Sequence, residues 1–283
     1  MKKILLLIAT AALLMGAIAC GEDEPGTRAR SVFTVNTPMI NHMVNTTNGE
    51  VLGLSNTRNT LVLDTAKHTA TLDLTYNDGT EKTISIQGIT ATPKRLGFYE
   101  LTAAGNVELK SFKGYVDFDE GSMRYTYTTI DGIRIISTTS EVFFLKTNNV
   151  ITYDDTTETT TMDNTMYQFN IEPTTSKATI KVAGILHAKD WKYFINMTAS
   201  GVPITVTNNG FTIAGNNLTT SSIYRTPTDS ITGATTQKTD KYPFKTFNAT
   251  IDLINDHLDA TFMMGASATV VATGRTYPDY TAY

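Results

Sequence analysis

The sequence of 283 residues predicts an all-β protein, built as an antiparallel sandwich or barrel with internal pseudo-duplication. Three observations predict it. Alternation of apolar and polar residues dominates after residue 30, where helical periodicity is nearly absent. Thr, Tyr, Val, Ile and Phe, which favour pleated and half-buried surfaces, are common. Segments of the later half also repeat the pattern of earlier segments in the same order.

Two lysines at positions 2 and 3 precede an almost wholly apolar stretch over 4–19. A basic start, an apolar run and small residues before Cys20 are typical of a secretory signal peptide over 1–19. The alternative is a single-pass membrane anchor, for which about 16 apolar residues are few, since a span usually takes about 20.

Residues 15–20, Met-Gly-Ala-Ile-Ala-Cys, resemble the lipobox of bacterial lipoproteins. The resemblance implies cleavage before Cys20, a diacylglycerol thioether on its sulfur and acylation of the new amine. Two acyl chains hold a protein stably to a bilayer, so the membrane is an expected partner. Cys20 is the only cysteine, and lipidation accounts for an otherwise unpaired exported thiol. Residues 20–30 are then expected to form a lipidated flexible tether.

Three consecutive carboxylates, Glu22, Asp23 and Glu24, follow the cysteine. This stretch resembles the acidic export signal of surface lipoproteins in Bacteroidota. The resemblance implies lipid-anchored attachment to the outer membrane and display at the cell surface. The alternative is a solvated tether without a sorting role.

The formal net charge is −4, and only 18% of the residues are charged. Basic clusters are absent from the sequence, so we expect no nucleic-acid partner. The aliphatic and aromatic content is too high for a disordered stalk. Composition therefore favours an exported globular β protein.

Hairpins dominate the first β-rich half, which we place at 31–153. Alternating runs at 69–76 and 82–87 flank an Asn-Asp-Gly turn, and Gly, Asn and Asp tolerate the positive φ that tight turns need. A second hairpin joins strands at 114–118 and 123–127. Further strands are expected at 133–136, 142–145 and 150–153.

Residues 154–164 are polar and low in complexity, which predicts a surface loop or linker. A second β-rich half, similar to the first, is then expected at 165–283.

The resemblance between the halves has two parts. The pattern of 61–64 and 70–74 recurs at 169–172 and 178–182, and the pattern of 116–118 and 123–127 recurs at 251–253 and 258–262. The shift between the copies grows, which predicts an insertion in the second copy within 215–245. The alternative is coincidence between any two alternating β segments.

Signatures of catalysis and metal binding are weak. The four histidines are far apart in the sequence, and zinc sites usually draw on closely spaced His and Cys. A glycoside hydrolase needs two carboxylates in a cleft. The candidates stand beside predicted turns, where carboxylates are normally solvated: they are Asp117, Glu120, Asp252 and Asp256. We therefore expect no metal, no cofactor and no catalytic site.

Binding signals are carried by aromatic residues beside predicted loops. Trp191, Tyr193 and Tyr224 are candidate ligand-binding residues, because flat rings stack on sugars at low entropic cost. The alternative for Trp191 is that it caps the end of the core.

Three functional hypotheses follow. The first is a non-catalytic, surface-displayed lipoprotein that binds a glycan or an envelope protein. The second is a calycin-like carrier of a small apolar ligand in a barrel interior, for which both halves supply aromatic residues. The third is a secreted-type hydrolase.

Overall fold

The computed structural model describes residues 31–119, 121–144, 146–153, 159–163, 165–186, 194–219, 221–225, 237–240, 244–264 and 268–275. All regular secondary structure in these residues is β, in twenty strands, as the sequence predicts. Over the same residues we find no helical segment with the length and hydrophobicity of a membrane span. The chain divides into two units, Met1–Ser140 and Glu141–Tyr283, each described below by itself.

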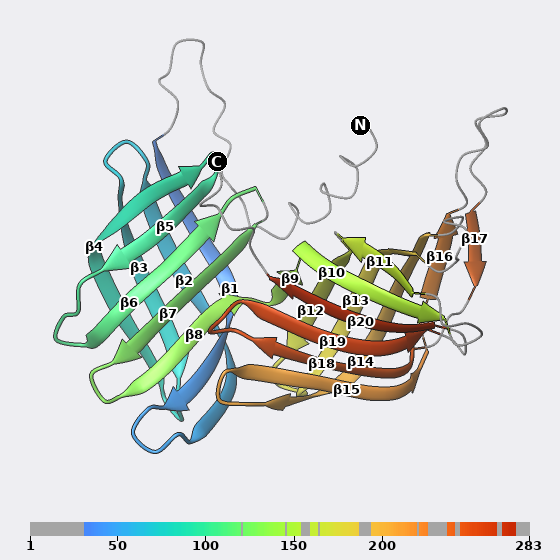
Figure 1. The fold of residues 1–283 in the computed structure, drawn as a ribbon. Helices are drawn as coiled ribbons and strands as arrows, with labels where there is room; N and C mark the ends of the chain where they lie inside the picture. The colour runs from blue at the N-terminus through green and yellow to red at the C-terminus, as the bar shows by residue number, and fades with distance from the viewer. Residues whose placement is uncertain are drawn as a thin grey trace, which may run out of the picture. The chain divides into compact units, whose positions relative to one another are not determined.

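The first unit is a closed eight-stranded antiparallel barrel in which each strand pairs with the next along the chain (Figure 1). Its strands are β1 (Val32–Asn45), β2 (Val51–Asp64), β3 (Thr69–Asn77), β4 (Glu81–Arg95), β5 (Phe98–Ala103), β6 (Leu109–Asp117), β7 (Ser122–Thr129) and β8 (Ile133–Thr139). The barrel closes where β1 pairs with β8, from Met39 opposite Thr139 to Asn45 opposite Ile133. Closure leaves no open sheet edge.

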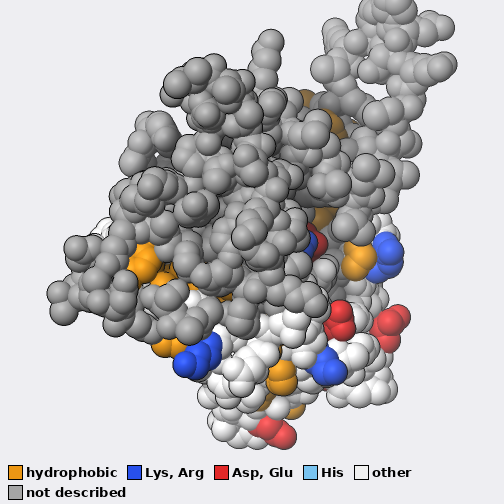
Figure 2. All heavy atoms as spheres, turned by 90° about the vertical axis from the view of Figure 1, so that its right-hand side faces the viewer, with side chains coloured by type: hydrophobic (Ala, Val, Ile, Leu, Met, Phe, Trp, Pro, Cys, Tyr) orange, Lys and Arg blue, Asp and Glu red, His pale blue; other side chains and the backbone are white. Residues whose placement is uncertain are grey.

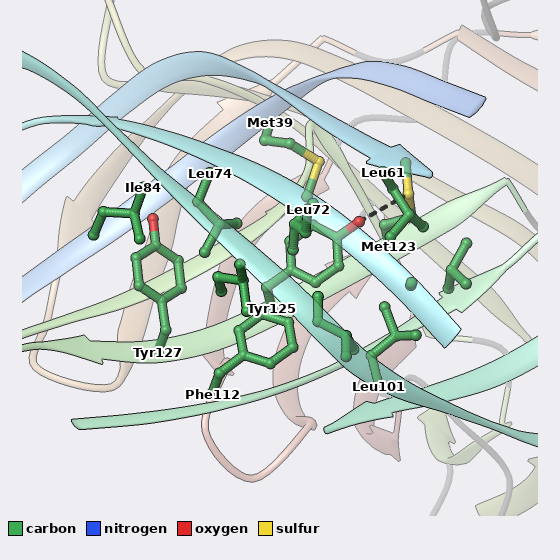
Figure 3. Close-up of a cluster of buried hydrophobic side chains, with 14 of the residues drawn as sticks. Met39, Leu61, Leu72, Leu74, Ile84, Leu101, Phe112, Met123, Tyr125 and Tyr127 are labelled. Carbon is green, nitrogen blue, oxygen red and sulfur yellow. Dashed lines mark hydrogen bonds between the residues drawn. The ribbon is translucent and has the colours of Figure 1, made fainter. Parts of the chain in front are cut away.

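The interior of this barrel is filled by side chains from all eight strands. Phe112 stacks on Tyr125 with ring centroids 6.1 Å apart (Figure 3). Tyr76 meets Tyr127 edge-on, with ring centroids 6.4 Å apart. The buried interior side chains of β2 and β3 pack into the same cluster, which includes Leu61, Leu63, Leu72 and Leu74. Eight strands enclose a space just wide enough for side chains to fill or for one small ligand, and in this barrel the buried side chains of that space form one hydrophobic cluster.

The second unit is a curled antiparallel sheet. Ten strands follow one another in the order β11-β10-β20-β19-β18-β15-β14-β13-β12-β9; off this order, β16 pairs with β14, and β17 pairs with β16. They are β9 (Glu141–Phe144), β10 (Lys146–Tyr153), β11 (Thr159–Asp163), β12 (Met166–Glu172), β13 (Lys177–Leu186), β14 (Phe194–Val206), β15 (Gly210–Leu218), β16 (Ser221–Arg225), β17 (Gln237–Asp240), β18 (Phe244–Asp252), β19 (His257–Met264) and β20 (Ala268–Arg275).

The strand order of the second unit repeats that of the barrel. β9 and β10 are consecutive in the chain, separated by one residue, and they pair with β12 and β20 respectively. The segment that contains β9 and β10 therefore pairs with both β12 and β20. In the barrel, β1 has the same position, because it pairs with both β2 and β8. The seven strands between β9 and β10 in the sheet order correspond to β2 through β8 of the barrel: they are β12, β13, β14, β15, β18, β19 and β20.

This order supports the predicted pseudo-duplication. The two segment pairs that resemble each other in sequence fall on β2–β3 and β12–β13, and on β6–β7 and β18–β19. The strands that leave the common order, β16 and β17, lie at 221–240, within the range where the sequence predicts an insertion.

The four corresponding hairpins also share one turn geometry. Each loop has four residues, and the last of them has positive φ: His68 (55°), Gly121 (62°), Ser176 (52°) and Asp256 (54°). An acidic residue ends the strand before each loop. Its carboxylate accepts hydrogen bonds from the loop in all four, as Asp64 does from the N–H groups of Ala66 and Lys67, both at 3.1 Å.

Two boundaries differ from the prediction. The units divide after Ser140, before the predicted linker at 154–164, because β9 and β10 pair with strands of the second unit. Within 154–164, residues 159–163 form β11, an edge strand on β10. The remainder of that range lies outside the described residues.

Candidate partner-binding surface

Most of the residues that the sequence singles out for lipidation, export and ligand binding lie outside the described residues. Cys20, Glu22, Asp23 and Glu24 lie outside the described residues, as do the expected signal peptide and tether. Trp191 and Tyr193 lie outside them too.

The backbone of Tyr224 is described, and it pairs in β16 between Ile195 of β14 and Lys238 of β17. Its side chain is not among the described ones. Lipidation, export and aromatic ligand binding therefore stay predictions.

The two ends of the barrel differ in how the chain reaches them. Successive turns of an antiparallel meander alternate between ends, so β1 begins and β8 ends at the same end. We call this the connected end, because the preceding residues and the second unit both join the barrel there. The opposite end, the free end, carries the turns at 46–50, 78–80, 104–108 and 130–132. No chain connection occupies it.

Three of the four free-end turns are hydrogen-bonded to one another. The backbone N–H and the side-chain hydroxyl of Thr46 both donate to the carbonyl of Gly132, at 2.9 and 2.7 Å. The N–H of Ile130 donates to the carbonyl of Glu108 at 2.8 Å. These bonds link the β1–β2, β7–β8 and β5–β6 turns into one surface, which we call the free-end platform: Thr46, Val107, Glu108, Ile130 and Gly132.

Local chemistry fixes the shape of each platform turn. Gly132 has φ of 85°, a conformation that favours glycine, and a Cβ there would lie 3.3 Å from Thr46 Oγ1. In the β5–β6 turn the side-chain oxygen of Asn106 accepts from the N–H groups of Glu108 and Leu109, both at 2.8 Å. Because its turns are held in this way, the platform is preformed and pays little ordering entropy on binding.

The platform presents aliphatic side chains to solvent. Val107 is 89% exposed and Ile130 is 51% exposed, on adjacent turns joined by the Ile130–Glu108 bond. Neither side chain contributes to the barrel core. A pair of exposed aliphatic residues on a rigid support is a feature of protein interaction surfaces.

An acidic residue follows each of these apolar residues in the chain: Glu108 follows Val107, and Asp131 follows Ile130. The pKa of Tyr76 is raised chiefly by burial, and the negative charges of Asp78, Asp131 and Glu108 raise it further against the opposing effect of Lys82. These three carboxylates belong to three of the free-end turns. Asp78 is paired with Lys82 at 2.8 Å, whereas within the described part of the chain neither Glu108 nor Asp131 forms an ion pair.

On the face shown in Figure 2, the described acidic and basic side chains are interspersed with apolar ones.

Two of the carboxylates considered for a hydrolase have roles in hairpin turns. Asp117 and Asp252 each accept hydrogen bonds from their own hairpin loops, and Asp117 also pairs with Arg95. These roles in turns account for both carboxylates, and Glu120 lies outside the described residues. Among the residues that the structure covers, no group of three or more His, Cys, Asp or Glu side chains is arranged to hold a metal ion.

Comparison with known proteins gives a remote structural match. No protein-family model matches the chain, and no curated protein is significantly similar to it in sequence. A solved structure, the isotype 1 transferrin binding protein B from serogroup B Neisseria meningitidis, aligns with 87% of this chain and 76% of its own. The sequence identity is 9% and the TM-score is 0.23, so the similarity is distant and supports no functional assignment.

Proposed function

We propose that the mature protein is a non-catalytic lipoprotein of the outer membrane, displayed at the cell surface, that binds a protein partner through the free-end platform. The observation that carries the proposal is the hydrogen-bonded platform, which holds Val107 and Ile130 exposed at the barrel end that no chain connection occupies. The lipobox-like segment at Cys20 and the acidic residues after it support the location.

A protein partner is favoured over a glycan by the kind of apolar side chain exposed. Sugars stack on flat aromatic rings, whereas the platform offers Val107 and Ile130. Among the described residues, Phe33 is the single aromatic residue in the group of exposed large hydrophobic side chains, and it lies at the other end of the barrel. The glycan version of the hypothesis rests on Trp191, Tyr193 and Tyr224.

The charges of the platform indicate the chemistry of the partner surface. Glu108 and Asp131 flank the aliphatic pair and are not neutralised by an ion pair within the described residues. A matching surface would place an apolar contact at the centre and Lys or Arg at the rim. Such charges accelerate association and give it a salt dependence.

Site-specific photo-crosslinking in intact cells tests this surface. A photoreactive amino acid at position 107 or 130 is expected to give the same discrete protein adduct. Leu96, which is 91% exposed on a turn at the connected end, is the matched control and is expected not to give that adduct. An adduct of equal yield from position 96, or none from 107 and 130, would refute the platform as the binding site.

Location is tested separately. Mass spectrometry of the native protein is expected to show a chain that begins at an acylated Cys20. Protease added to intact cells is expected to degrade the protein, and protection of the whole chain would refute surface display.

A further inference from the structure

We infer that the connected end of the barrel rests on the bilayer that holds the lipid of Cys20, with Val32, Phe33 and Leu96 in contact with it. The inference rests on the lipid anchoring in the proposed function and adds an orientation, with the connected end toward the membrane and the free-end platform away from it. We call these three residues the membrane-side patch.

The tether enters the barrel at this end. The N–H and the side-chain hydroxyl of Thr65, in the β2–β3 turn, donate to the carbonyl of Ser31 at 2.7 and 3.1 Å. The point where the described chain begins is thereby fixed to the connected end. Ser31 lies eleven positions after Cys20, and at about 3.5 Å per position this stretch reaches at most about 38 Å. The tether thus keeps the connected end near the bilayer.

The membrane-side patch is apolar and exposed. Leu96 is 91% exposed at the tip of the β4–β5 turn, and Val32 and Phe33 at the start of β1 are 45% and 37% exposed. Phe118 joins the two sites, because its N–H donates to the carbonyl of Gly97 at 2.9 Å and its ring lies 5.7 Å from that of Phe33. The patch therefore continues across the mouth of the barrel.

The turn that carries Leu96 is rigid. Arg95, which precedes it, contacts the carboxylates of Asp117 at 2.7 Å and Asp119 at 2.6 Å. Gly97, which follows it, has φ of 75°, and a Cβ there would lie 2.7 Å from Asp119 Oδ1. Because the residues on both sides are held, Leu96 stays directed outward.

Electrostatics favour the same orientation. Cations of the connected end are paired with carboxylates: Lys67 with Asp64 at 3.3 Å, Lys94 with Glu100 at 2.7 Å, and Arg95 as above. The free end carries Glu108 and Asp131 without such pairing among the described residues. An anionic membrane surface repels the free end more than the connected end.

A small patch is sufficient because the lipid already holds the protein at the surface. A tethered contact acts at a high effective concentration, and interfacial binding scales with the apolar area buried. The contact therefore needs to orient the barrel and not to recruit it.

Spin labels at the two barrel ends test the orientation. Leu96→Cys and Val107→Cys place a nitroxide on two fully exposed turn tips, so neither substitution threatens folding. The acylated full-length protein is reconstituted into vesicles that contain anionic phospholipid. The thioether at Cys20 blocks that sulfur, which leaves one labelling site in each variant.

The label at 96 is expected to lose collisions with a water-soluble nickel chelate and gain collisions with oxygen on reconstitution, whereas the label at 107 is unchanged. Equal behaviour of the two labels, or protection of 107 instead, would overturn the orientation. An unmodified Cys20 in mass spectrometry would overturn the anchoring on which both proposals rest, so the two failures are distinguishable.

Discussion

The guanidinium of Arg95 lies 2.7 Å from the carboxylate of Asp117, whose side chain is fully buried. Removing the cation leaves that carboxylate buried without its counter-charge. Arg95→Met, which keeps the aliphatic contact with the Phe98 ring, is expected to destabilise the barrel by about 2 kcal/mol. This is less than for a fully buried pair, because Arg95 is 32% exposed and partly screened by solvent.

Urea unfolding measures this loss. Lys67→Met is the matched control, since it removes a cation from the solvent-exposed Lys67–Asp64 pair and should change stability far less than Arg95→Met does. Equal losses of stability for the two substitutions would show that the burial of Asp117 does not determine the size of the loss.

Asn59 replaces backbone pairing inside the barrel. The β2–β3 ladder ends at Thr60 and Asp73, and beyond it the N–H of Thr75 donates to the side-chain oxygen of Asn59 at 2.9 Å. The amide of Asn59 donates to Ser137 Oγ at 2.9 Å. Asn59→Leu leaves both groups without these bonds and is expected to cost about 2 kcal/mol. The midpoint of guanidinium unfolding should fall without a change in slope.

Tyr127→Phe is the control for this prediction. The Tyr127 hydroxyl is buried, and no residue in the described part of the chain bonds it. Its removal should change stability by less than about 0.5 kcal/mol or increase it. A larger loss would show that the hydroxyl makes a hydrogen bond that matters.

Local sequence signals predicted the hairpins well. The strands at 69–76 and 82–87 appear as β3 and β4, and Gly79 in the turn between them has φ of 118°. β1 gave no such signal, because from Met39 to Val44 its residues are buried on both faces and do not alternate. Local sequence signals also could not predict that β1 and β8 close the barrel, because the paired residues are about a hundred positions apart.

Edge strands and loop contacts escaped prediction for other reasons. β11 is Thr-rich and half-exposed, so its polar pattern indicated a loop, although Thr favours strands. The free-end platform depends on bonds such as that between Thr46 and Gly132, which no short motif encodes. Asn106 and Gly132 signalled turns, but their association is a property of the closed barrel.

The shared hairpin turns make a further prediction. Ser176, the last residue of the β12–β13 turn, has φ of 52°, and Gly121, at the same position of the β6–β7 turn, has φ of 62°. Ser176→Gly should stabilise the second unit by about 0.5–1 kcal/mol by relieving left-handed strain. Gly121→Ala should destabilise the first by about 1 kcal/mol. Melting temperatures of the two variants should move in opposite directions, and a shift of both in the same direction would contradict a shared geometry.

Buried tyrosines predict loss of stability in alkali. Burial raises the pKa of Tyr125, Tyr127 and Tyr167 above the ordinary value. Below about pH 10, the pKa of tyrosine in an unfolded chain, these tyrosines are neutral in both states and do not lower the free energy of unfolding. Above that pH the unfolded chain ionises first, so the free energy of unfolding falls as the pH rises. Phenolate absorbance of these residues should therefore appear together with loss of the β circular dichroism signal.

Tyr125→Phe should remove part of the rise in phenolate absorbance. The substitution also removes the 3.2 Å contact between the Tyr125 hydroxyl and the sulfur of Met123. A phenolate signal that is complete while the barrel stays folded would show that these hydroxyls reach solvent.

The ionised carboxylate of Asp252 predicts that the β18–β19 turn loses stability in acid. Burial alone would raise its pKa, but hydrogen bonds from Asn255, Ile254 and Asn209 outweigh burial and hold the pKa below its ordinary value. The backbone N–H groups of Ile254 and Asn255 lie 2.8 and 2.9 Å from the carboxylate. A lowered pKa in the folded state contributes stability above about pH 4, which is lost as the pH falls through the folded pKa. Asp252→Asn should therefore be less stable than the parent near neutral pH and converge with it in acid. Urea midpoints between about pH 7 and pH 2 measure this, and a difference that does not change with pH would show that ionised Asp252 does not hold the turn.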